Sequence, residues 1–245
     1  MTRQILDEVR QFVQENIGEF HANRLAKLQR MELKKVLRRK NPYLFRAKNI
    51  LTAHELVQGI LDAHLSSQEE TLFGQFLEEV AIFVAQQVHD GHKSTAEGID
   101  LELQIDNVYY IVSIKSGPNW GNSSQIKRMR TNFNQAKKRL RQSRRVTNVV
   151  AVNGCCYGQD NRPDKGDYLK LCGQRFWEFI SGDARLYVEI IEPLGHQAKE
   201  RNEAFQEEYA RLINLFSREF MDEFCVDGVI DWEKLVAFNS AAKRS

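Results

Sequence analysis

Two runs of residues in the middle of the chain alternate polar and apolar side chains at a period of two. They are residues 98–105 and residues 108–117, and only Asp106 and Asn107 separate them. A period of two is typical of β-strands with one buried face. Asp and Asn tolerate the positive φ that a two-residue turn needs. The sequence therefore predicts a β-hairpin that buries one of its faces in a core.

The register of this hairpin decides which side chains meet. If Ile105 pairs with Val108, then Asp100 lies directly opposite Ser113, and Lys115 shares their face. An acid and a lysine that meet on paired strands suit metal-dependent cleavage of a phosphodiester. The alternative is an ordinary amphipathic hairpin whose polar face meets water. The apolar residues expected on the core side are Leu101, Leu103, Val112 and Ile114.

Charge is unevenly distributed along the chain, although the net charge is only +2 over 245 residues. Residues 107–159 contain ten basic residues and no acidic one, and residues 24–48 contain ten basic residues against the single acid Glu32. Acids gather in residues 66–79 and in the last fifty. This separation predicts a polyanion-binding face backed by an acidic scaffold. The alternative is that each run is a solvated helix face.

Length and cysteine pattern limit the class of protein. A chain of 245 residues forms one large or two small domains. No signal peptide and no apolar run of membrane-spanning length occurs, so we expect a cytoplasmic protein. The cysteines lack zinc-type spacing, and we expect them to be reduced and mostly buried. They are Cys155, Cys156, Cys172 and Cys225.

The order of elements predicted along the chain is helix, sheet, then helix. Helical patterning in the first 40 residues ends at Asn41-Pro42, and Ser66 and Ser67 offer caps for a long helix. Further helices are expected at about 52–63, 68–88, 125–141, 168–182 and 196–224, and after Asp231, with strands at 146–153 and 186–191.

One acid lies on a narrow face of small residues in the helix expected at 68–88. Gly74, Ala81 and Ala85 share that face with Glu78. Small residues permit another element to approach closely, so we expect Glu78 at an interior edge. The alternative is an ordinary surface acid.

A turn-rich loop, residues 116–122, follows the hairpin and leads into a basic helix capped by Asn122, Ser123 or Ser124. Helix N-terminal amides and the cations on this helix would both attract phosphates. Trp120 in the loop could stack on bases or simply pack at the surface.

At this point the residues resemble a known family. Gly98-Ile99-Asp100 and Ser113-Ile114-Lys115, after a helix bearing Glu78, resemble the PD-(D/E)XK nuclease superfamily. The longer strings at residues 112–123 and 171–177 resemble Type II restriction endonucleases, and the similarity extends over about residues 41–193. The resemblance implies an α/β (α+β) fold with an α/β/α core and a mixed central sheet. It also implies Mg²⁺-dependent cutting of a short double-stranded DNA site by a homodimer, with a cognate DNA methyltransferase as genetic partner.

On this resemblance we expect a basic helical region at 1–65, the nuclease core at 66–195 and a helical region at 196–245, packed as one unit. Asp100 would bind metal, Lys115 would be the motif lysine, and Glu78 would be the helix-borne acid. Ser113 stands among the catalytic residues where the family usually has Glu or Asp, and a hydroxyl is a poor Mg²⁺ ligand. The second acid is expected to be Glu78, with Glu102 and then Glu97 as alternatives.

The DNA-contacting residues expected in the loop and the helix are Asn119, Trp120, Asn122, Ser123, Gln125, Lys127, Arg128 and Arg130. Other functions fit the same residues less closely. One is a structure-specific or non-specific repair nuclease of the same superfamily. Another is a non-catalytic DNA-binding protein on a decayed nuclease core, and a third is an RNA-binding protein.

Overall fold

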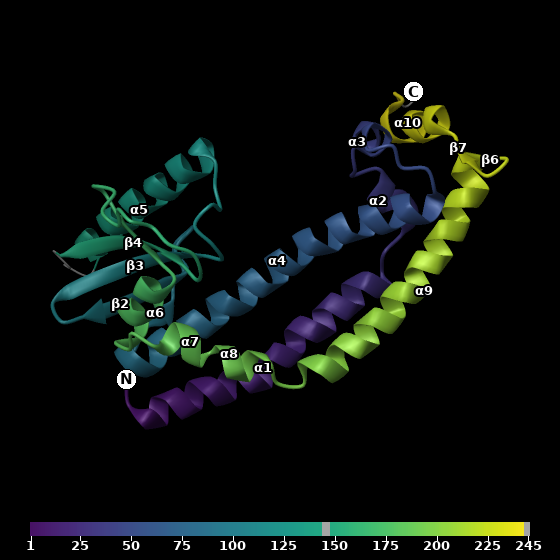
Figure 1. The fold of residues 1–245 in the computed structure, drawn as a ribbon. Helices are drawn as coiled ribbons and strands as arrows, with labels where there is room; N and C mark the ends of the chain where they lie inside the picture. Colours follow the sequence, from purple (N-terminus) through teal and green to yellow (C-terminus); the bar gives the residue numbers. More distant parts are fainter. Residues whose placement is uncertain (144–147, 243–245) are drawn as a thin grey trace. The chain divides into compact units, whose positions relative to one another are not determined.

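The computed structural model describes residues 1–143 and 148–242, and they form two compact units (Figure 1). Unit 1 consists of Met1–Gly18 and Phe73–His196, and unit 2 consists of Glu19–Leu72 and Gln197–Ser245. Two helices, α1 (Arg3–Gln29) and α4 (Ala53–His89), contribute residues to both units. The first eighteen residues therefore group with the sheet and not with the basic segment that follows them.

Unit 1 is built around a mixed five-stranded sheet with the order β1-β2-β3-β4-β5. The strands are β1 (His92–Lys93), β2 (Leu101–Ile105), β3 (Val108–Lys115), β4 (Val149–Cys155) and β5 (Leu169–Cys172). Strands β1 to β3 are antiparallel, and β3 to β5 are parallel. The hairpin register is the predicted one, with Ile105 opposite Val108 and Asp106 at a φ of 52°. Of the strand expected at 146–153, residues 146 and 147 lie outside the described residues.

Helices cover both faces of this sheet, which confirms the α/β/α prediction. Helix α5 (Ser123–Ser143) packs on the face that carries Ile111 and Ala151 (Figure 1). Its apolar stripe recurs at helical spacing, and Asn122 caps it by accepting from the amides of Ser124 and Gln125 at 3.1 and 3.0 Å. The buried stripe is Met129, Phe133, Ala136 and Leu140.

The opposite face receives α6 (Gln174–Ser181), which ends at Gly182 with a φ of 67°. Phe179 stacks edge-on against Tyr110, and Phe176 lies over Gly154. The helix predicted at 168–182 is thus correct only in its second half, because β5 takes the first half. The strand predicted at 186–191 is wrong: the segment forms two short helices, α7 (Leu186–Glu189) and α8 (Ile191–Leu194).

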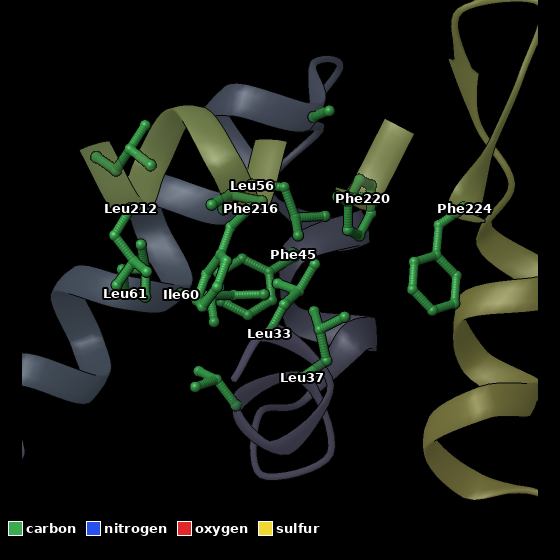
Figure 2. Close-up of a cluster of buried hydrophobic side chains, with 14 of the residues drawn as sticks. Leu33, Leu37, Phe45, Leu56, Ile60, Leu61, Leu212, Phe216, Phe220 and Phe224 are labelled. Carbon is green, nitrogen blue, oxygen red and sulfur yellow. The ribbon is translucent and has the colours of Figure 1, made fainter. Parts of the chain in front are cut away.

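Unit 2 is helical, with a separate apolar core (Figure 2). Leu33 and Phe45, from α2 (Leu33–Leu37) and α3 (Pro42–Ala47), meet Leu56 of α4 and Phe216 of α9 (Ala198–Phe224). The apolar stripe of α9 is therefore buried within its own unit. A small hairpin, β6 (Cys225–Val226) with β7 (Val229–Ile230), leads into α10 (Trp232–Ser240). Asp231 caps that helix as predicted, accepting from the amide of Lys234.

Helix α4 runs unbroken through residues 53–89, so the predicted helix boundary at Ser66 and Ser67 is wrong. Serine is a poor helix former, but it does not interrupt a helix whose apolar stripe continues on both sides. None of the helices that the structure describes is long and apolar enough to cross a membrane.

Candidate active site

The end of the β2–β3 hairpin brings an acid and a lysine together. The amide of Asp100 donates to the carbonyl of Val112 at 2.8 Å, which extends the hairpin pairing by one residue. Oδ2 of Asp100 accepts from the amide of Ile114 at 2.6 Å and from Oγ of Ser113 at 3.4 Å. Nζ of Lys115 lies 3.6 Å from the same oxygen. The register thus produces the predicted convergence of Asp100, Ser113 and Lys115.

The ammonium of Lys115 is held from three sides. It donates to the carbonyl of Ile114 at 2.7 Å, it faces Asp100, and it lies 5.5 Å from the ring centre of Trp120. A lysine held in this way has lost much of the rotamer freedom that an exposed lysine keeps.

Glu78 on α4 reaches the same place. Gly74, one turn earlier, allows close approach of the chain after β3, because a Cβ there would lie 3.3 Å from Cβ of Ser116, a tight contact. Burial and then the nearby charge of Asp100 raise the pKa of Glu78, while Lys93 and Lys115 oppose the shift. The nearest ammonium is that of Lys93, 3.8 Å from Oε1. Two carboxylates therefore converge with incomplete neutralisation, which favours a bound cation.

The donor set suits Mg²⁺. This ion prefers oxygen ligands and is usually held by one or two carboxylates, substrate phosphates and water. Asp100 and Glu78 supply two carboxylates at the hairpin end. Within residues 1–143 and 148–242, no group of three or more His, Cys, Asp or Glu side chains is arranged to hold a metal ion. A metal here would therefore depend on water and substrate for its remaining ligands.

The other two acids considered as metal ligands, Glu102 and Glu97, make different contacts. Glu102 shares the strand face of Asp100 but is only 4% exposed, and its oxygens accept from Oγ of Ser94 at 2.5 Å and Oη of Tyr109 at 2.7 Å. Glu97 is exposed and pairs with Arg128 at 2.7 Å. The charge of Asp100 acts directly on Glu78, where it helps to raise the pKa.

The loop and helix that follow Lys115 present some of their polar residues to solvent and use others internally. Asn119, Ser123 and Lys127 are exposed. Asn122 caps α5, and its amide donates to Oε1 of Gln125 at 2.9 Å. Arg128 and Arg130 are exposed but ion-paired, the first with Glu97 and the second with Asp167 at 3.2 Å.

Trp120 packs against the α5 side of the sheet, and its Nε1 donates to Oδ1 of Asn153 at 3.1 Å. These contacts favour the packing interpretation of this residue over stacking on bases. Asn153 was not among the expected site residues, although a lone amide within the apolar run 149–155 was a signal for it. It is 1% exposed and lies at the register of Ser113.

A cavity of about 610 Å³ opens at the carboxyl ends of β4 and β5. Cys156 contributes to its wall, and burial, followed by the charge of Glu78, raises the pKa of this thiol to about 12. A thiol with such a pKa is neutral and unreactive at physiological pH. All four cysteines are free, and Cys155, Cys156 and Cys172 are buried, as expected.

The fold is a mixed sheet with helices on both faces. An Asp, a Lys and a Glu meet where its hairpin ends. Together these features define a nuclease of the restriction-endonuclease-like class. The comparison with protein-family models matches residues 7–202 to the family described as Type II restriction endonuclease EcoO109I. The chain belongs to this family. The match includes the whole sheet and all three converging side chains. A comparison with curated proteins gives no match.

Proposed function

We propose that the protein hydrolyses phosphodiester bonds at a short, specific sequence of double-stranded DNA, with Mg²⁺ as cofactor. The observation that carries this proposal is the convergence of Asp100, Glu78 and Lys115 at the hairpin end. The family supports endonuclease activity in a restriction system.

Asp100 and Glu78 would hold the Mg²⁺, which when bound polarises a phosphate and lowers the pKa of water. Lys115 has the position and charge to orient the attacking water or to offset the negative charge that develops on the phosphate. Ser113 would act through Asp100, because its hydroxyl donates toward Oδ2 of that residue at 3.4 Å. The lost motif carboxylate is thus replaced by Glu78 from a different element.

DNA would approach along the loop 116–122 and the exposed N-terminal turns of α5. The residues we propose to contact it are Asn119, Ser123, Gln125, Lys127, Arg128 and Arg130. Asn122 and Trp120, also expected at this surface, would shape it, the first by capping α5 and the second by packing beneath the loop. The helix N-terminus and its cations together favour phosphate oxygens. A gene for a DNA methyltransferase beside this one would support a restriction system, since a host must protect its own sites.

Plasmid cleavage with and without Mg²⁺ tests the proposal. We expect discrete fragments with Mg²⁺, none without it, and a rate at least about 10²-fold lower for Asp100→Asn. A smear would indicate a non-specific nuclease. Binding without any cleavage would indicate a non-catalytic DNA-binding protein. This outcome is tested because Ser113 stands where the family usually has a carboxylate. Wild-type rates for Asp100→Asn would show that the active site lies elsewhere.

A further inference from the structure

A row of three polar side chains crosses the parallel part of the sheet. Ser113 of β3 is in register with Asn153 of β4, and Asn153 is in register with Lys170 of β5. Neighbours at one register project from the same face of a sheet. Ser113 and Asn153 are 2% and 1% exposed. Buried polar groups persist where they are hydrogen-bonded, so their partners indicate what the row holds in place.

Two members of the row bind the loop that follows Lys115. Oδ1 of Asn153 accepts from the indole Nε1 of Trp120 at 3.1 Å. Nζ of Lys170 donates to the carbonyl of Pro118 at 2.9 Å. Asn153 also donates through Nδ2 to the carbonyl of Ser113 at 3.2 Å. The amide of Asn153 therefore joins the strand that precedes Lys115 to the loop that follows it.

The bound loop places an aromatic ring beside the lysine. The ring centre of Trp120 lies 5.5 Å from Nζ of Lys115, within the range of a cation–π interaction. The ends of the loop are fixed by the amide of Tyr157, which donates to the carbonyl of Ser116 at 3.0 Å, and by the Asn122 cap of α5. Between these ends the loop contains Gly117 and Gly121, and the two anchors on β4 and β5 constrain this middle part.

We propose that Asn153 and Lys170 are positioning residues, which hold the loop 116–122 so that Trp120 fixes the ammonium of Lys115 beside Asp100. The catalytic meaning of this placement rests on the proposed function. The placement itself is a property of the free protein. It also gives Trp120 a task other than contacting bases, because its indole N–H would have to leave a buried acceptor before the ring could enter DNA.

A kinetic experiment separates positioning from DNA contact. Trp120→Phe keeps a ring but loses the indole donor, and Asn153→Leu removes the acceptor. We expect each variant to lower the single-turnover cleavage rate at saturating DNA by roughly 10- to 100-fold, with the Kd for DNA in Ca²⁺ changed less than about twofold. Trp232→Phe in α10 is the matched control and should cleave and bind as wild type. Weaker binding with an unchanged saturating rate would make Trp120 a DNA contact and overturn the proposal.

A second experiment needs neither DNA nor metal. An aromatic ring shifts nearby nuclei, so the ε-CH₂ signal of Lys115 in ¹³C-lysine-labelled protein should lie upfield of the other lysines, with Lys115→Arg giving the assignment. Trp120→Leu should abolish the shift and Lys170→Met should reduce it, even if Asn153→Leu fails to fold. An ordinary wild-type chemical shift would overturn the proposal. If the expected chemical shifts are observed but the protein never cleaves DNA, the positioning proposal stands and the nuclease function is refuted.

Discussion

Burial and the neighbouring charge of Asp100 raise the pKa of Glu78, so the ionised form of this residue is disfavoured in the folded protein. The side chain is 27% exposed, and its nearest cation is 3.8 Å away. A carboxylate whose charge is disfavoured in this way costs the folded protein stability. Under the proposed function, Glu78 would supply the carboxylate that position 113 lacks.

Glu78→Gln should therefore separate stability from activity. The folded pKa lies above the unfolded value, so ionised Glu78 destabilises the protein above the raised pKa, and this penalty disappears as the pH falls toward 4.5. In EDTA at pH 7 we expect a higher Tm for Glu78→Gln than for wild type, with the difference vanishing in acid. Cleavage in Mg²⁺ should fall about 10²-fold.

Thermal denaturation as a function of pH, alongside the cleavage assay, measures both effects. Glu79→Gln is the matched control, since that acid is the next residue on α4 and is exposed. It should change neither quantity appreciably. A Glu78→Gln variant with a lower Tm at pH 7 would contradict the electrostatic account.

Replacing Glu102 should have the opposite effect on stability from replacing Glu78. It is buried and accepts from Tyr109 and Ser94, so Glu102→Gln disrupts a satisfied hydrogen-bond network. We expect a loss of about 1–3 kcal/mol in the free energy of unfolding, measured by urea denaturation. Tyr109→Phe should cost about 1 kcal/mol. Normal stability with lost cleavage would instead place Glu102 among the metal ligands.

At the scale of elements, local signals predicted the hairpin well. The turn at Asp106 and the strict alternation fix the register, and the register alone brings Asp100 to Lys115. The small residues on its helix face predicted only that Glu78 lies at an interior edge, and its place beside Asp100 was expected from the family resemblance. These features depend on residues close in sequence or on a single helix face.

Elements that depend on distant partners were predicted less well. Residues 186–191 are rich in residues that favour strands, yet the sheet ends at β5 and the segment turns into α7 and α8. Strand preference depends on packing and pairing with a neighbour, and among the described residues this segment pairs with no strand. The contacts of Asn153 and Lys170 could not be predicted for a similar reason, because their partners Ser113 and Pro118 lie 40 and 52 residues away in the sequence.

Close packing between β4 and α6 gives a prediction at this scale. A Cβ added at Gly154 would lie 2.2 Å from the ring of Phe176, which is fully buried. Gly154→Ala should therefore lower the free energy of unfolding by about 1–3 kcal/mol in urea denaturation. Gly117→Ala is the comparison, because its clash is with the exposed ring of Tyr157, which can move away. Equal losses of unfolding free energy for both variants would show that the packing between β4 and α6 adjusts as easily as the exposed ring of Tyr157.

The N-terminal turns of α5 give a further prediction, which concerns DNA binding. Lys127 is exposed and has no ion-pair partner among the described residues, whereas Glu97 neutralises Arg128. Lys127→Ala should reduce the log–log salt dependence of DNA binding by about one unit, as expected for one lost phosphate contact. Glu97→Gln should strengthen binding by freeing Arg128. Fluorescence anisotropy across a salt series measures both, and unchanged slopes would place the duplex on the basic segment 24–48.

For the whole molecule, a single candidate active site within residues 1–143 and 148–242 has a consequence for assembly. Cutting both strands of a symmetric site is most simply done by two copies related by a two-fold axis. We therefore expect a homodimer of 28.5 kDa chains by light scattering at micromolar concentration. A monomer mass, both free and on cognate duplex, would leave sequential nicking as the route to a double-strand break.

The path of the chain between its two units also constrains how the protein can be made and altered. It passes between them at residues 18–19, 72–73 and 196–197, and the first two passages lie inside α1 and α4. A ribosome delivers Arg10 long before its partner Glu189, so this contact within unit 1 must wait for most of the polypeptide. No single truncation can isolate either unit. A chimera made by exchanging a terminal segment longer than residues 1–18 or 197–245 with a relative would therefore transplant pieces of both.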